Sequence, residues 1–288
     1  MASNICFKAL TVVLTAVSFM GKAYTQTPVP SLRPVTATYS IETGSSHLAD
    51  TYLSPIKYSG WSAAFSYERW QAMKFSPEKW VMRLSVRAEL DRAVNPAKNS
   101  AIWNAGMRGS WSMMRRYRLP VERLTAGIGP MTDLHFGCMY LPRNGNNPAQ
   151  AHAAFTVGVA AFLTYGLHIG RLPVTIGYQP SLPLVGAFFV PEYGELYYEI
   201  SLGNHPNSVH AAWPASYRAI YNLITSDLHL GSTTLRLGYR FDLISSQANH
   251  ITSRHITHMA VIGIGGEWLS VAQRRPLTDT SRIISAYY

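Results

Sequence analysis

Apolar and polar side chains alternate along residues 234–243, whose sequence is TLRLGYRFDL. Successive side chains of a β-strand point to opposite faces, so this segment would present one apolar face and one face bearing Arg236, Arg240 and Asp242. The pattern recurs in other long segments that have aromatic residues near their ends. This repetition is typical of a transmembrane β-barrel, whose strands turn apolar side chains to lipid and polar ones to the lumen. We therefore predict an all-β, antiparallel transmembrane barrel.

The alternation predicts about ten strands. They are expected at residues 35–43, 58–71, 79–91, 101–113, 122–138, 152–167, 172–188, 216–230, 234–244 and 255–270. The connections at 44–57, 92–100, 139–151, 189–215 and 245–254 are long, and those at 72–78, 114–121, 168–171 and 231–233 are short. Outer-membrane barrels have long outer loops and short periplasmic turns, so both termini are expected on the periplasmic side.

Two segments leave twelve strands as an alternative. Proline cannot donate to a strand ladder, so Pro180 and Pro183 require the strand at 172–188 to bulge or break. Residues 195–202, with the sequence ELYYEISL, alternate well enough to form a further strand inside the long loop. The uncharged run at 153–170 is interrupted by Thr and Gly and is interpreted as a strand in preference to a spanning helix.

The two ends of the chain are expected to differ from the barrel. A short apolar run after Lys8, followed by small residues, predicts a signal peptide at residues 1–25 and an outer-membrane barrel at 26–271. Residues 272–288 continue past the last predicted strand, either as a periplasmic extension or with Arg282–Tyr288 as a closing strand. Cleavage would leave Cys138 as the only thiol, which excludes an intramolecular disulfide.

Composition and charge agree with an exported barrel. Only 14% of residues are charged and 12% are aromatic, and the chain has 21 glycines. The formal charge of +10 includes Lys8 and Lys22 of the predicted signal. The basic residues are spread along the chain and do not form one face, which argues against nucleic acid as a partner. Outer-membrane lipid and lipopolysaccharide are the expected partners, with solvated loop charges as the alternative explanation.

Charged side chains on the polar faces are expected to fill the lumen. Arg83, Arg87 and Glu89 share one face of their strand, and a basic side chain facing the middle of the lipid costs about 2–4 kcal/mol. If the hairpin register places Glu68 opposite Arg83, opposite charges would form a ladder. The predicted ion network comprises Glu68, Arg83, Arg87, Glu89, Arg108, Asp227, His229, Arg236, Arg240, Asp242 and Glu267. A ten-stranded barrel filled in this way would be plugged.

Two Asp-x-His pairs could carry chemistry. Asp133 and His135 would point into the lumen near the outer rim, where an Asp that orients a His could support a general base. The alternative is a hydrogen-bonded pair without catalytic function. Asp227 and His229 are expected at the opposite end, in a cluster with Arg236 and Glu267 that closes the base of the barrel. No recognisable nucleophile motif accompanies either pair.

The remaining histidines and aromatics indicate location more than chemistry. His250, His255 and His258 lack the spacing of a metal motif, so neither a metal nor a cofactor is predicted. Aromatic side chains near segment ends are expected in interfacial belts: these are Trp61, Trp80, Trp103, Trp111 and Trp268. Aromatic residues in the long loop could instead bind a glycan or a surface protein: these are Tyr193, Tyr197, Tyr198 and Trp213.

Several segments carry a resemblance to a known family. They are residues 47–55 (HLADTYLSP), 58–60 (YSG), 197–204 (YYEISLGN) and 233–239 (TTLRLGY). With them, most of the predicted mature chain resembles a family of uncharacterised outer-membrane barrels from gut-type Gram-negative bacteria. The resemblance implies an outer-membrane location and brings no activity, substrate or catalytic residue.

Three functions fit these expectations. A barrel with a structural or surface-interaction role is preferred, since its lumen is expected to be filled and its loops carry aromatics. A narrow pore or a component of an uptake assembly is the first alternative. An outer-membrane hydrolase that uses Asp133 and His135 is the second.

Overall fold

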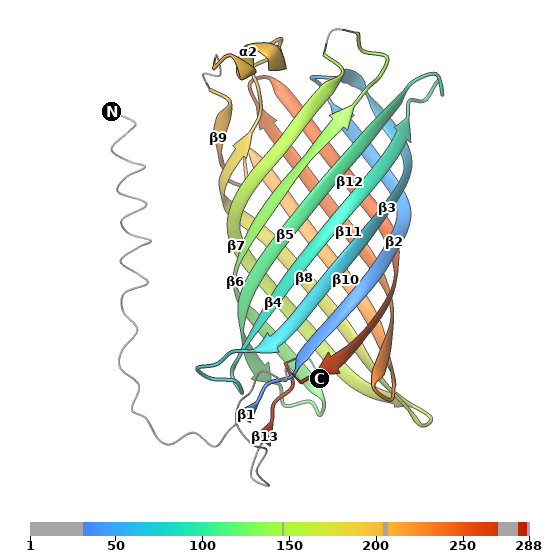
Figure 1. The fold of residues 1–288 in the computed structure, drawn as a ribbon, viewed down its shortest axis with the longest axis vertical. Helices are drawn as coiled ribbons and strands as arrows, with labels where there is room; N and C mark the ends of the chain where they lie inside the picture. Colours follow the sequence, from blue (N-terminus) through green and yellow to red (C-terminus); the bar gives the residue numbers. More distant parts are fainter. Residues whose placement is uncertain (1–30, 146, 204–206, 270–281, 287–288) are drawn as a thin grey trace, which may run out of the picture.

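Ten strands close into one antiparallel barrel in the computed structural model, which describes residues 31–145, 147–203, 207–269 and 282–286 (Figure 1). The barrel strands are β2 (Val35–Asp50), β3 (Ser54–Ala72), β4 (Trp80–Val94), β5 (Ala101–Arg118), β6 (Leu124–Tyr140), β7 (Ala149–Ile169), β8 (Leu172–Phe189), β10 (Tyr217–Leu230), β11 (Thr233–Ala248) and β12 (Ile251–Trp268). Strand β12 pairs with β2, and β10 pairs with both β8 and β11. The prediction of ten antiparallel strands is confirmed, and the alternative of twelve is wrong.

The connections define two ends of the barrel. The loop end carries the connections 51–53, 95–100, 141–148, 190–216 and 249–250, and the terminal end carries 73–79, 119–123, 170–171 and 231–232 together with β1 and β13 (Figure 1). The strands run further than predicted, so 190–216 is the one long connection among the described residues. The expected long loop at 245–254 is a two-residue turn, because Asn249 and His250 adopt positive φ angles of 50° and 61°, as in a type I′ hairpin.

The long connection folds over the loop end. It contains a five-residue helix, α2 (Tyr197–Ser201), and a short strand, β9 (Val209–Ala212), that pairs with the end of β8 (Figure 1). The interpretation of residues 195–202 as a strand is therefore wrong. No described helix is long and apolar enough to span a membrane.

The pairing of β8 with β7 is irregular beside a proline, as the sequence predicts. Val157 of β7 lies opposite Val185 and the next residue, Gly158, lies opposite Pro183, so the register shifts by one residue on β8. The predicted bulge is confirmed. Below it, Gln179 and Ser181 keep their side chains inside the barrel, where both are buried.

A second, two-stranded sheet lies beneath the terminal end. Strand β1 (Ser31–Leu32) pairs in parallel with β13 (Arg282–Ile283), outside the barrel sheet (Figure 1). The barrel closes between β12 and β2 without these residues. The predicted signal peptide and most of the predicted C-terminal tail lie outside the described residues.

The outer surface of the barrel is apolar. The predicted outward face of β7 is exposed at Phe155, Val157, Leu163 and Tyr165, and the other barrel strands contribute similar side chains. Among these are Tyr39, Phe65, Leu90, Met107, Leu134, Ile176, Ile224, Leu237 and Ile262. The period of two thus places apolar residues outside along the whole circumference.

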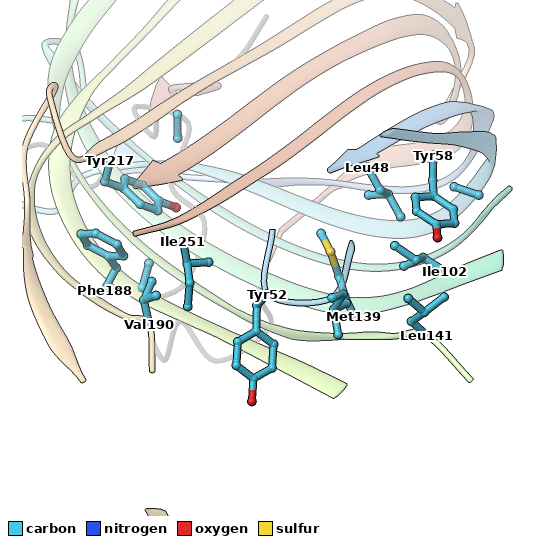
Figure 2. Close-up of a cluster of buried hydrophobic side chains, with 14 of the residues drawn as sticks. Leu48, Tyr52, Tyr58, Ile102, Met139, Leu141, Phe188, Val190, Tyr217 and Ile251 are labelled. Carbon is cyan, nitrogen blue, oxygen red and sulfur yellow. The ribbon is translucent and has the colours of Figure 1, made fainter. Parts of the chain in front are cut away.

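The interior contains an apolar cluster at each end. The loop-end cluster includes aromatic side chains from separate strands, with Tyr58, Phe188 and Tyr217 among them (Figure 2). The terminal-end cluster consists of Trp70, Val81, Met114, Met131, Ala160, Phe162 and Ala286. Ala286 belongs to the segment after β13, so the end of the chain completes the packing at this end.

Candidate functional site

Buried charges occupy the interior between the two apolar clusters. Among the described residues, eight carboxylates face five guanidinium groups in the interior, and all are buried except Glu89 and Arg108, whose side chains are 7% and 10% exposed. The carboxylates are Glu42, Asp50, Glu68, Glu89, Asp91, Asp133, Asp227 and Asp242, and the guanidinium groups are Arg83, Arg87, Arg108, Arg236 and Arg240. The inward positions of the strands thus supply an excess of three negative charges when histidine is neutral.

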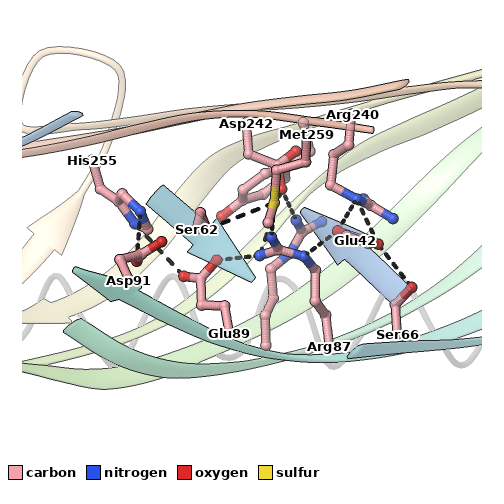
Figure 3. Close-up of polar contacts among 12 residues, drawn as sticks. Glu42, Ser62, Ser66, Arg87, Glu89, Asp91, Arg240, Asp242, His255 and Met259 are labelled. Carbon is pink, nitrogen blue, oxygen red and sulfur yellow. Dashed lines mark hydrogen bonds and ion pairs between the residues drawn. The ribbon is translucent and has the colours of Figure 1, made fainter. Parts of the chain in front are cut away.

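The ion network is densest around Glu42 of β2. Its carboxylate lies 2.8 Å from Nε of Arg87 and 3.0 Å from Nε of Arg240, and it accepts a hydrogen bond of 2.8 Å from Ser66 (Figure 3). Arg87 also pairs with Glu89. Glu42 is fully buried, so each of its contacts replaces water that the folded protein excludes.

A second group of ions lies toward the terminal end. Arg236 donates to both carboxylate oxygens of Asp227 at 2.7 and 2.8 Å, and to Glu68 at 2.8 Å. Arg83 donates to Gln179 at 2.8 Å. The contact of Arg236 with Glu68 and that of Arg83 with Gln179 each connect two strands that are not neighbours in the sheet. These contacts therefore cross the interior of the barrel.

Glu68 and Arg83 are not opposite each other in the register, as the predicted ladder would require. Glu68 lies opposite Ser85 in the register, and Arg83 lies opposite Trp70. The hairpin connecting β3 and β4 therefore shifts the pairing by two residues from the predicted one. Glu68 contacts Arg236 of β11 instead, a residue 168 positions away in sequence.

The predicted cluster at the base of the barrel forms only in part. Asp227 and Arg236 pair, but Glu267 is exposed at the end of β12. His229 is half-buried and contacts the hydroxyl groups of Thr175 and Thr234 at 2.9 and 3.2 Å. Glu267 is close enough to His229 to interact with it electrostatically. The other predicted members of the ion network lie in the interior.

Asp133 and His135 do not hydrogen-bond to each other in the described chain. Asp133 accepts a hydrogen bond of 2.8 Å from Nε of Arg108 and a longer one of 3.5 Å from Tyr221. His135 makes no hydrogen bond within the described part of the chain. In the ladder, Arg108 lies opposite His135, and its guanidinium group donates to Asp133.

The excess negative charge is concentrated toward the loop end. No guanidinium group lies within 4.0 Å of Asp50 or Asp91 in the described chain, and histidines face them instead. His255 lies 3.2 Å from Asp91 and 3.6 Å from Glu89, and His152 lies 3.7 Å from Asp50. We call these five residues the acid–histidine cluster.

The cluster borders small cavities that His135 also lines. One is lined by Glu89, Gly106, His135 and His255, and the adjacent one by His135, His152 and His255, among others. The space suffices for about one or two water molecules. Three histidines from β6, β7 and β12 therefore face one region of the interior.

Sequence reasoning missed part of this cluster. Asp50 lies in the segment 44–57, which is predicted as a loop, and His152 and His255 are the first residues of predicted strands whose inward faces were not assigned. The alternation of inward and outward side chains could have identified Asp50 and His152, because it continues through both residues. Asp50, for example, follows the buried Ser46 and Leu48 at even spacing.

The aromatic residues of the long connection divide into two groups. Tyr193, Tyr198 and Trp213 are exposed by 68%, 70% and 56%. Tyr197 points inward: its hydroxyl group donates to Gln150 at 3.1 Å and accepts from the backbone N–H of Ala151 at 2.6 Å. Burial raises the pKa of Tyr197. Tyr197 therefore anchors α2, and the other three side chains are exposed at the surface.

Comparisons with solved structures find barrels of low sequence identity. The β domain of the Bordetella autotransporter BrkA is 10% identical, with a TM-score of 0.41, over 82% of this chain and 100% of that one. The outer membrane protease OmpT from Escherichia coli is 7% identical, with a TM-score of 0.42, over 86% and 99%. The transport unit of the autotransporter AIDA-I from Escherichia coli is 10% identical, with a TM-score of 0.38, over 90% and 97%. No curated protein matches the chain.

Residues 9–275 match the family described as a protein of unknown function, DUF3316. The chain belongs to this family. The predicted resemblance to a family without an assigned activity is confirmed at this level.

Proposed function

We propose that this protein is a closed outer-membrane barrel that conducts no ions and binds a partner at the cell surface through its loop end. The filled interior carries the proposal. Two apolar clusters enclose a layer of buried ion pairs, and each cavity between them has room for about one or two water molecules. A permeating ion would have to displace paired charges that water does not reach.

The outer surface supports the membrane location. Apolar side chains surround the barrel, and a cation lies over an aromatic ring at each end: Arg92 over Trp103 and Arg115 over Tyr117. Interfacial belts combine aromatic rings with basic groups that reach the headgroups. On this proposal residues 1–25 direct export, the barrel domain lies within residues 26–271, and the termini face the periplasm.

Basic side chains on the outside of the loop end fit an anionic lipid layer. A groove on the outer face is lined by His47, Lys57 and Arg254, among others. The carboxylates of the barrel strands point inward or lie at the terminal end, so this groove has no acidic residue in its lining. The phosphate groups of lipopolysaccharide are the proposed partners of this face.

The exposed aromatic residues support a surface partner. Tyr193, Tyr198 and Trp213 lie on a segment that is fastened to the barrel, since the hydroxyl group of Tyr52 donates to the backbone of Glu195 at 2.7 Å. A fastened segment loses little conformational freedom on binding. Flat, exposed rings of this kind suit a glycan or an apolar patch of a surface protein.

Conductance of the refolded, signal-free protein in planar bilayers tests the closed barrel. We expect no steady openings from a sample whose fold is established by circular dichroism. Arg83→Ala serves as a probe of the interior, because Arg83 is buried between Gln179 and Ser181. Steady openings in the wild type that change in this variant would overturn the proposal and establish a pore.

Glycan-array binding tests the surface role. A triple variant, Tyr193→Ala, Tyr198→Ala and Trp213→Ala, should lose binding that the wild type shows. Phe75→Ala is a matched control, because Phe75 is 55% exposed on the terminal-end connection 73–79. Equal binding by the wild type and the triple variant would exclude these rings from the partner surface.

A further inference from the structure

We propose that Glu89, Asp91 and His255 bind a divalent transition metal, of which zinc is the type, inside the barrel. One ligand atom from each residue lies within 4.8 Å of the other two. His255 faces Asp91 through Nε2 at 3.2 Å and Glu89 through Nδ1 at 3.6 Å, so one of these two ring nitrogens would bind the metal together with the carboxylates. Imidazole and carboxylate ligands together suit zinc better than calcium or magnesium.

The surrounding side chains hold these ligands in place. One carboxylate oxygen of Glu89 pairs with Arg87, so the other is directed toward His255 (Figure 3). Asn104 donates to Oδ2 of Asp91 at 2.6 Å. Such outer contacts orient the ligands of metal sites. The cavity beside Glu89 and His255 supplies room for a water molecule at the fourth position.

The charge distribution favours a cation at this place. Asp91 is fully buried, and its Oδ1 has no hydrogen-bond partner in the described chain. An unpaired carboxylate oxygen in the interior carries a large desolvation cost. The interior as a whole has three more carboxylates than guanidinium groups, and a divalent cation would offset two of these charges.

A protonated His255 between the two carboxylates is the alternative that requires no metal. An imidazolium ion has no lone pair with which to bind zinc. The two arrangements therefore differ in a direct measurement, which is the uptake of zinc by the folded protein.

The test is calorimetric titration of the refolded, chelator-treated protein with zinc chloride, followed by metal analysis after gel filtration. We expect one equivalent of zinc for the wild type and at least a tenfold loss of affinity in Asp91→Asn and His255→Gln. His258→Gln is the matched control, because His258 lies on the same strand with its ring against Tyr239 on the outer face. It should bind as the wild type does.

Two results would overturn the proposal: no stoichiometric uptake by the folded wild type, or uptake that only His258→Gln abolishes. X-ray absorption of the zinc-loaded wild type keeps the test decisive if a variant fails to refold. Its spectrum must show a shell of nitrogen and oxygen ligands that includes one imidazole. The site does not rest on the proposed surface role, since a closed barrel without a surface partner would bind zinc equally well.

Discussion

Glu42 is the residue on which the ion network depends most. Its buried carboxylate contacts Arg87, Arg240 and Ser66. Glu42→Gln removes the charged partner of Arg240 and one of the two carboxylates closest to Arg87, both of which are buried. We expect a loss of about 3–5 kcal/mol in the free energy of unfolding, measured by urea denaturation in lipid vesicles. Glu267→Gln, at an exposed position, should change it by less than about 0.5 kcal/mol. Similar small losses in both variants would contradict the network's role.

Close approach of two strands makes Gly44 sensitive to the smallest substitution. A Cβ atom at Gly44 of β2 would overlap the backbone carbonyl of His258 on β12. Gly44→Ala should therefore force the backbones apart and destabilise the barrel by about 1–3 kcal/mol, as overpacking does. Gly109→Ala on β5 is the control, because nothing lies within 4 Å of its Cβ position. Urea midpoints of the two variants give the comparison, and equal midpoints would exclude a steric effect at the β2–β12 contact.

At the scale of the element, the sequence is sufficient to predict which side chains of a strand point inward. It is not sufficient to predict which side chains of other strands they contact. A period of two is local, so the inward positions of Arg83 and Arg87 follow from their own strand. The partner of Glu68 depends on the stagger of the closed barrel, which places Arg236 beside it. Strand ends were also underestimated, because the two-residue turn at Asn249 and His250 has no glycine to mark it.

The segment after β13 is an element whose docking can be measured. Arg116 donates to the backbone carbonyl of Ser285 at 2.7 Å, and Ala286 packs against the terminal-end cluster. Removal of residues 282–288 deletes the strand partner of β1, so amide hydrogens of Ser31 and Leu32 should exchange faster. Exchange in β2 and β12 should stay slow, since those strands pair with each other. Hydrogen-exchange mass spectrometry resolves both regions, and unchanged exchange at β1 would contradict the docking.

At the scale of the whole molecule, alternation predicted a polar interior, and the structure adds an apolar cluster at each end. These clusters arise where inward positions near the strand ends carry residues such as Ile102 and Met114. Their side chains meet across the lumen only after the barrel closes. The acid–histidine cluster arises in the same way, from β2, β4, β7 and β12. Distant strands bring these groups together, so no short motif marks them.

Three successive layers of side chains block the lumen: the terminal-end cluster, the buried ion pairs and the loop-end cluster. The barrel should therefore stay closed when one layer is weakened. Trp70→Ala removes the largest side chain of the terminal-end cluster and should lower the free energy of unfolding by about 3–5 kcal/mol. The variant should still conduct no ions in planar bilayers, because the ion pairs of Arg236 and Glu42 and the loop-end cluster lie along the same path. A steady current through the folded variant would mean that the terminal-end cluster is the only barrier and that the buried ions line a pathway.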